Sequence, residues 1–162
     1  MRQPHLISVA RFVRDLLNYD EQLIKFDRRN IIASDFSTGY IVVNGAMPQS
    51  VLARGQKFDG TSETMTYTAS ISHAVVLEFY GDKAYGTAED FLMLSRSQKA
   101  NELRRKNALT IMMVSSITDV GQLLGQAHGN RVHLSFNVQY APARDVHTLR
   151  IDTPKFQFLE DK

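Results

Sequence analysis

Apolar and polar side chains alternate without a break through residues 131–140, RVHLSFNVQY. Strict alternation predicts a strand with one face toward a core. The apolar positions are Val132, Leu134, Phe136, Val138 and Tyr140, and the polar positions are Arg131, His133, Ser135, Asn137 and Gln139. A solvated strand face more often carries Lys and Glu, so these mostly neutral hydrogen-bonding groups indicate a face that meets something other than water.

A longer alternation runs through residues 64–80, TMTYTASISHAVVLEFY. One side reads Met65, Tyr67, Ala69, Ile71, His73, Val75, Leu77 and Phe79, and the other side begins with Thr64, Thr66, Thr68 and Ser70. At about 3.3 Å per residue an unbroken strand of this length would exceed ~50 Å. We therefore expect it to bend or to project as one arm of a hairpin. Its second half, AVVLEFYG, is apolar on both sides and predicts deeper burial.

The remaining pattern predicts helices and shorter strands. Apolar residues recur at helical spacing in 5–17, which predicts an amphipathic helix. A second helix is predicted over 82–97 with Asp82 as its N-cap, and a polar helix over 98–107. Strands are predicted at 21–29, 39–45 and 108–116, a turn over 141–146, and one or two edge strands within 147–161. The glycine-rich stretch 45–62 lacks a period, so 45–64 is predicted as a flexible loop or hairpin tip.

This order of elements predicts an α+β fold with a mainly antiparallel or mixed β-sheet packed against two to three helices, and with a long projecting β-hairpin. A chain of 162 residues is most simply one domain, spanning 1–162.

Composition narrows the functional classes. The chain has no cysteine, which excludes disulfide scaffolds, thiolate zinc sites and cysteine nucleophiles. The formal net charge is only +2, so charge alone does not indicate nucleic acid. No window approaches the ~20 apolar residues of a membrane span and no signal peptide is evident. We expect a soluble, untargeted protein.

Candidate catalytic chemistry is sparse. His128, His133, Asp145 and His147 could hold a zinc ion if their segments paired, but their spacing matches no helical ligand pair. No serine occupies a GxSxG turn and no phosphate-binding loop is present. The sequence therefore favours a protein that is not an enzyme and that needs no cofactor or metal.

Two basic runs, Arg28 with Arg29 and residues 104–106, raise nucleic-acid binding as an alternative. The second run follows Glu102 on a short polar helix, where a solvated or salt-bridged face is the favoured interpretation.

The polar strand faces favour contacts with protein. Threonine is common on exposed sheets, which is the simpler explanation for each strand alone. Uncharged donors and acceptors, however, are easier to desolvate than Lys or Glu. We therefore expect interface residues on two separate surfaces, and the candidates are Thr64, Thr66, Thr68, Ser70, Arg131, His133, Ser135, Asn137 and Gln139.

Three segments carry a family resemblance: AVVLEFYGDKAYGTAEDFLMLSRS, NELRRKNALTIMMVSSITDV and RVHLSFNVQYAPARDVHTLRID. In these the chain resembles the neck or tail terminator proteins of tailed bacteriophages. The likeness covers about residues 70–152 and is a pattern of elements with scattered matching residues, whereas residues 1–60 match less clearly.

The resemblance implies a non-enzymatic virion structural protein. Such a protein forms a homohexameric ring at the head-proximal end of the tail tube, stops tube polymerisation and joins the tail to the head-tail connector. The implied partners are other copies of the chain, the tail tube protein, the connector or stopper protein and, as a further candidate, the sheath protein. DNA would pass through the lumen without specific binding. Assembly would take place in the host cytoplasm, and another head-completion or tail-tube component is the alternative.

Overall fold

The computed structural model describes residues 4–26, 39–112, 114–120 and 130–148, with backbone alone for 46–48. The helices are α1 (Pro4–Leu17), the 3-10 turn η1 (Glu21–Leu23), α2 (Ala84–Leu94) and α3 (Gln98–Lys106). The strands are β1 (Ile24–Lys25), β2 (Tyr40–Asp59), β3 (Thr64–Tyr80), β4 (Thr110–Met112), β5 (Thr118–Asp119), β6 (Arg131–Tyr140) and β7 (Ala143–His147).

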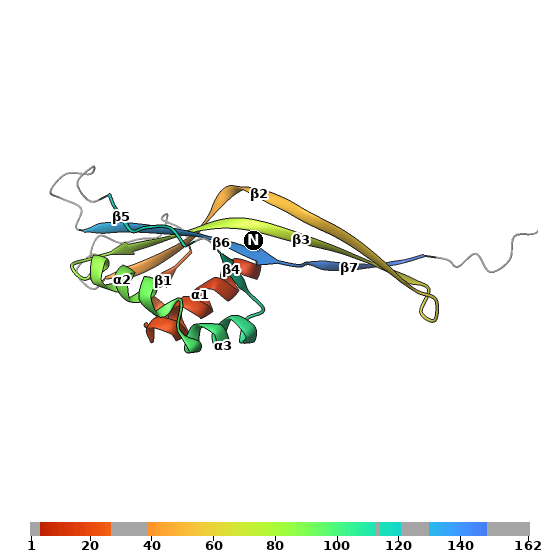
Figure 1. Cartoon of the computed structure of the whole chain (residues 1–162), viewed down its shortest axis with the longest axis horizontal. Coiled ribbons are helices and arrows are strands. Elements are labelled where there is room, and N and C mark those ends of the chain that lie inside the picture. Colours follow the sequence, from red (N-terminus) through yellow and green to blue (C-terminus); the bar gives the residue numbers. More distant parts are fainter. Residues whose placement is uncertain (1–3, 27–38, 113, 121–129, 149–162) are drawn as a thin grey trace, which may run out of the picture.

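These strands form one mixed sheet with the order β1-β2-β3-β6-β4, while β5 pairs with β6 and β7 pairs with β3. The pair of β1 and β2 is parallel and β2, β3 and β6 run antiparallel. The three α-helices cover one face of the sheet, as Figure 1 shows. The predicted α+β fold is confirmed. No helix among the described residues is long and apolar enough to cross a membrane.

Helix α1 matches the predicted amphipathic segment. Pro4 takes the first position, where a missing N–H is tolerated. Val9, Phe12 and Val13 are fully buried against the sheet and the other helices. Asn18 ends the helix at a positive φ of 51°, a conformation that Asn adopts more readily than most residues.

The core lies between the helices and the sheet. Phe91 of α2 meets Phe12 of α1 and Phe136 of β6, with ring centroids 6.3 and 5.9 Å apart. Val75, Leu77 and Phe79 of β3 join this cluster, as do Val132, Leu134, Phe136 and Val138 of β6. We call this side the near face of the sheet and the opposite side the far face. The far face carries a small apolar cluster of its own, formed by Tyr40, Val42 and Tyr80.

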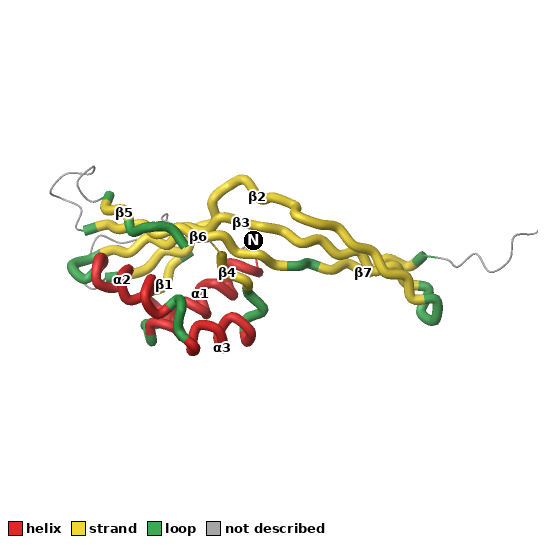
Figure 2. The backbone as a smooth tube through the Cα atoms, in the orientation of Figure 1, coloured by secondary structure: helices red, strands yellow, loops and turns green. Residues whose placement is uncertain are grey.

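Strands β2 and β3 form a hairpin along their whole length, from Tyr40 opposite Tyr80 to Asp59 opposite Thr64. Asp59 accepts hydrogen bonds from the Thr61 N–H and the Ser62 hydroxyl, which closes the turn. The distal part of the hairpin extends away from the helices in Figures 1 and 2.

The flexible loop predicted over 45–64 is therefore wrong for residues 45–59, which belong to strand β2, whereas the alternative of a hairpin tip agrees with the turn at residues 60–63. The pairing shifts register between Gly45 and Gln49 and again between Val51 and Ala53. Each shift adds residues to one strand alone, so the side-chain alternation by which strands are recognised is broken. Two such shifts between Gly45 and Ala53 leave this part of the strand without a regular alternation.

Strands β6 and β7 act as one long partner of β3. Tyr140 lies opposite Ile71, and Ala143 lies opposite Thr68. The two pairs are three residues apart along β3 and also three residues apart from β6 to β7, so the register continues unbroken. Pro142 lacks an N–H and interrupts the strand, yet its carbonyl accepts from the Ala69 N–H at 3.2 Å. The turn predicted for 141–146 is therefore wrong.

Together, residues 50–59, 64–70 and 143–147 form a three-stranded projection, which we call the arm. Strand β3 is its central strand, with β2 on one side and β7 on the other.

Several predicted boundaries also shift. Lys83, not Asp82, occupies the N-cap of α2, without a side-chain hydrogen bond, and the helix ends at Leu94. Strand β4 is shorter than the predicted 108–116, and β1 is shorter than the predicted 21–29 because η1 precedes it. The edge strands predicted beyond His147 fall mostly outside the described residues.

Candidate interaction surface

The nine candidate interface residues lie on one face of the sheet. Residues directly opposite each other in an antiparallel pair project to the same side. His133 lies opposite Glu78, Gln139 opposite Ser72, and the β3 positions 64–70 follow on the same strand. The neighbouring positions Val75, Leu77 and Phe79 pack toward the helices. The candidates therefore all belong to the far face, residues 64–70 to its arm half and residues 131–139 to its body half.

The arm half of the far face is polar and partly charged. Thr66 lies opposite both Lys57 and Asp145, and its hydroxyl donates to the Asp145 carboxylate at 2.7 Å. The Thr64 hydroxyl donates to the Ser62 carbonyl at 3.0 Å. Charged side chains on the neighbouring strands thus flank the row of hydroxyls predicted on β3.

The body half of the far face contains a buried carboxylate. Glu78 is fully buried, and its Oε2 accepts from the Tyr80 hydroxyl at 2.6 Å and from Arg131 Nη2 at 3.1 Å. His133 Nε2 lies 3.8 Å from the same oxygen, and Asn44 Nδ2 lies 3.5 Å from the other one. A buried charge requires such partners, because its desolvation is costly.

Aromatic rings support this cluster. Tyr40 and Tyr80 stack with centroids 4.5 Å apart, and the Arg131 guanidinium lies over Tyr80 at 5.4 Å. Burial, and then the hydrogen bond to Glu78, raises the pKa of Tyr80, so its hydroxyl remains a donor. Two predicted interface residues, Arg131 and His133, therefore contact an internal carboxylate.

The remaining candidates of β6 are half-buried. Ser135 is held by Ser115, whose hydroxyl accepts from the Ser135 N–H at 2.9 Å and whose N–H donates to the Ser135 carbonyl at 2.7 Å. Asn137 and Gln139 lie opposite Ala74 and Ser72 of β3, next to strand β4.

A second buried polar group lies where the arm leaves the body. His5 Nε2 of α1 and His73 Nδ1 of β3 are 2.6 Å apart, and His5 stacks on Tyr140 with centroids 4.2 Å apart. Both imidazoles are buried. Burial and the neighbouring His73 lower the pKa of His5. Gly45 lies directly over this pair, because a Cβ there would come within 2.7 Å of His73 Cε1.

The zinc alternative fails on geometry. His133 lies opposite Glu78 and Asp145 opposite Thr66, so twelve β3 positions, about 40 Å of strand, separate them. His147 lies farther still along the arm, and His128 falls outside the described residues. Elsewhere in the described part of the chain, no group of three or more His, Asp or Glu side chains is close enough to hold a metal ion.

The comparison with known families decides the identity. A family model described as phage neck terminator protein matches residues 8–162. The chain belongs to this family. No curated protein matches the sequence. The match confirms the resemblance and extends it over most of the N-terminal segment, where the resemblance was weaker.

Membership in the phage neck terminator family assigns the chain to the virion neck or tail and to contacts with other head or tail components. A structural family of this kind implies a protein that does not act as an enzyme. The buried polar cluster around Glu78 on the far face and the buried pair of His5 and His73 agree with a structural role, since their groups bind one another.

Two side chains of the basic run at residues 104–106 contact other parts of the fold. Arg104 of α3 donates to the Ser95 carbonyl and to Asn101, and Lys106 lies 3.7 Å from Asp15 of α1. A cation beside the last carbonyls of α2 is favourable for the helix dipole. The other basic pair, Arg28 and Arg29, falls outside the described residues.

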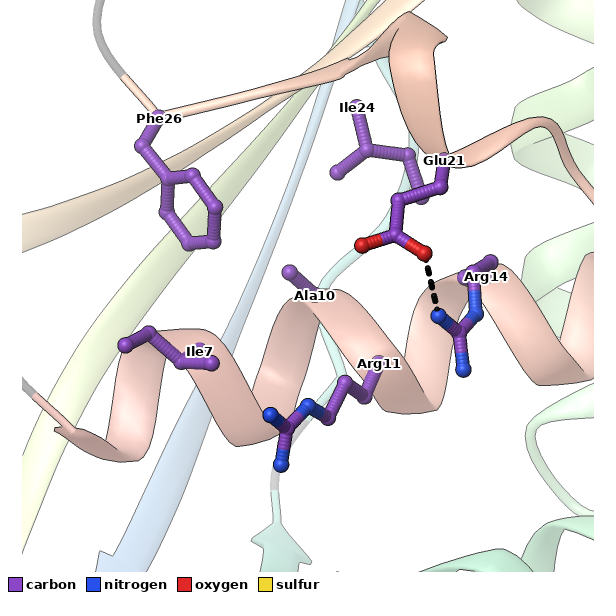
Figure 3. A pocket seen from close by; sticks show the side chains of 7 residues that line it. All are labelled: Ile7, Ala10, Arg11, Arg14, Glu21, Ile24 and Phe26. Atoms are coloured by element: carbon purple, nitrogen blue, oxygen red, sulfur yellow. Dashed lines mark hydrogen bonds and ion pairs between the residues drawn. The ribbon is translucent and has the colours of Figure 1, made fainter.

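A pocket of about 180 Å³ opens beside α1, and Figure 3 shows the side chains that line it. They are Ile7, Ala10, Arg11, Arg14, Glu21, Ile24 and Phe26. The one carboxylate among them, Glu21, accepts from Arg14 Nη1 at 2.7 Å. This ion pair is a contact between α1 and η1, and the Glu21 side chain is largely exposed to solvent.

Proposed function

We propose that the chain is the subunit of a homohexameric ring that caps the head-proximal end of the tail tube, stops its polymerisation and joins the tail to the head-tail connector. The whole chain, 1–162, would act as one domain. The match to the phage neck terminator family carries this proposal.

The arm supports a ring. In a closed ring each subunit presents two different surfaces, one to each neighbour. The sheet continues beyond the helices as the arm, so the subunit can contact a neighbour at a distance from its own core. The far face, with its polar residues on β3 and β6, is proposed to contact neighbouring subunits or the tail tube and connector proteins.

The lumen of such a ring would carry DNA without holding it. The chain has 19 basic and 17 acidic side chains, and a nearly neutral subunit suits a lumen in which DNA slides, whereas a dense array of lysines would hold the phosphates. We place the finished ring in the virion neck, with assembly in the host cytoplasm and the sheath protein as a further neighbour in a contractile tail.

A deletion in the phage tests the function. Electron microscopy of the lysate should show tails of uncontrolled length and heads without joined tails. Tails of normal length beside heads that lost their DNA would instead indicate a head-completion protein, and absence of tails altogether would indicate a tail-tube component. Mass measurement of the purified protein, alone and bound to tail tubes, tests the sixfold stoichiometry.

A further inference from the structure

The exposed large apolar side chains of the described residues gather at two places. Five belong to the arm: Val51, Leu52 and Phe58 on β2, Tyr67 on β3, and Val146 on β7. Three belong to helix α2: Tyr85, Met93 and Leu94. The ninth, Met112, lies on β4. Isolated exposed apolar residues need no explanation, but clusters of them indicate contact surfaces.

The first cluster follows the near side of the arm. Phe58, Met65 and Val146 lie side by side across the three strands, and the next row of the same side holds Tyr67 and Arg144. Tyr67 is 46% exposed although it is a large aromatic residue. This side carries no helix, since the helices end where the arm begins.

The near side of the arm is also basic and hollowed. Arg54 and Arg144 line a groove together with Tyr67 and Pro142. The carboxylates of the arm, Asp59 and Asp145, occupy the alternate positions that belong to the far face. The groove therefore combines an aromatic floor with two guanidinium groups.

The second cluster is the outward side of α2. Ala84, Ala88 and Phe91 of this helix are buried in the core. Tyr85, Glu89 and Met93 follow one another at intervals of four residues on the opposite side, and Met93 is 76% exposed. Asp82 and Asp90 are exposed beside them, and among the described residues the exposed cations Lys83 and Arg96 lie at the two ends of the helix. This ridge is apolar and acidic where the groove is apolar and basic.

The two surfaces cannot meet within one molecule. Tyr67 lies thirteen β3 positions from Tyr80, about 44 Å of strand, and α2 begins four residues after Tyr80. Figure 1 places α2 and the arm at opposite ends of the molecule. Complementary surfaces at opposite ends produce a head-to-tail contact, which closes into a ring when the rotation allows it.

We propose that the arm of one subunit binds helix α2 of the next copy. Phe58, Met65, Tyr67 and Val146 cover Tyr85 and Met93, while Arg54 and Arg144 face Glu89 and Asp90. The occupant of the groove is thus a second copy of the chain. This contact rests on the proposed ring and names the two surfaces that build it.

Disulfide trapping tests the contact directly, because the natural chain has no cysteine. The double variant Tyr67→Cys with Met93→Cys places one thiol on each surface, and both positions are exposed. On oxidation we expect a ladder of covalent oligomers that ends at the ring size and collapses on reduction. Each single variant should stop at the dimer.

The matched control is Tyr67→Cys with Met112→Cys, which moves the second thiol to an exposed methionine outside α2. We expect no ladder from this variant under the same conditions. An equal ladder from the control would mean that random collisions form the disulfides, and would overturn the assignment.

Charge exchange provides a second measurement. Arg144→Glu and Asp90→Arg should each weaken association about tenfold or more, since like charges then meet across the interface. The combined variant should recover much of the loss. Arg105→Glu, an exposed change on α3 outside both surfaces, should leave association unchanged.

The mass of the unoxidised wild-type assembly separates the two proposals. One outcome is that the wild-type chain forms a ring while the double variant Tyr67→Cys with Met93→Cys gives no ladder and the combined charge exchange restores no association. In that case the proposed arm contact is wrong, but the proposed ring is not. If the chain remains monomeric both in solution and on tail tubes, the ring itself is wrong and the contact fails with it.

Discussion

Glu78 and Arg131, which are 53 residues apart in sequence, form an ion pair on the far face with 3.1 Å between Oε2 and Nη2. Their side chains are only 1% and 13% exposed. Breaking a buried pair leaves a charge without its partner and typically costs about 3–5 kcal/mol. The pair therefore ties the start of β6 to the centre of the sheet.

Glu78→Gln should lower the free energy of unfolding by about 3 kcal/mol, because it keeps the shape of the side chain and removes the charge that Arg131 and Tyr80 bind. Urea denaturation followed by circular dichroism measures this loss. The control is Glu63→Gln, since Glu63 lies 3.8 Å from His147 in an exposed pair and should change stability by less than about 1 kcal/mol. Equal stability of both variants would contradict the structural role of Glu78.

Gly45→Ala should destabilise the fold by about 1–3 kcal/mol, because the added methyl group meets the buried His73 ring at 2.7 Å. Gly86→Ala is the matched change on an exposed side of α2, where no atom lies within 4 Å of the new Cβ. That variant should be more stable by about 0.5–1 kcal/mol, since Ala is the better helix former. Thermal unfolding of both variants gives the comparison, and a loss in Gly86→Ala as large as in Gly45→Ala would refute it.

The histidine pair predicts a pH dependence. The pKa of His5 is lowered in the folded state, so below the ordinary value of about 6.5 the unfolded chain binds more protons than the folded one. The free energy of unfolding should therefore fall as the pH drops below about 6.5, by at most about 1.4 kcal/mol per pH unit for one proton. Denaturation curves between pH 7.5 and 5, in roughly half-unit steps, measure this slope.

His5→Phe should flatten that slope, because phenylalanine can stack on Tyr140 but cannot bind a proton. His147→Gln is the control, since the His147 side chain is 68% exposed. A slope that persists in His5→Phe and disappears in His147→Gln would show that the buried pair is not its source.

Asn137→Glu should impair assembly more than folding. Asn137 lies half-buried on the far face, and a carboxylate there would have to be desolvated on contact with a neighbouring protein. Native mass measurement and thermal unfolding of the same sample separate the two effects. Gln98→Glu, an exposed change on α3, serves as the control. Intact rings from well-folded Asn137→Glu would show that this part of the far face meets only water.

The sequence was informative where the alternation is unbroken. Strands β3 and β6 pair residue for residue from Tyr80 and Arg131 to Ile71 and Tyr140, so their near and far faces were predicted correctly. Strand β2 was missed beyond Gly45 because two register shifts interrupt its period. Strand β7 was missed because Pro142 is typical of a turn, although here it only interrupts a continuing strand.

The buried cluster around Glu78 could not be predicted in the same way. A glutamate within the apolar run AVVLEFYG was visible, but its partners Asn44 and Arg131 lie 34 and 53 residues away. Which residues meet Glu78 depends on the strand order and register, and neither is contained in the local pattern.

The unbroken register of β3 with β6 and β7 makes the length of the arm adjustable in steps of two residues. Since side chains alternate with a period of two, adding a pair of residues to each of the three strands would extend the arm by about 7 Å and leave every side chain on its original side. The core beneath the helices would not be touched. In the proposed ring, a longer arm would therefore increase the spacing between neighbouring subunits, and with it the diameter of the channel, without changing the stability of the domain.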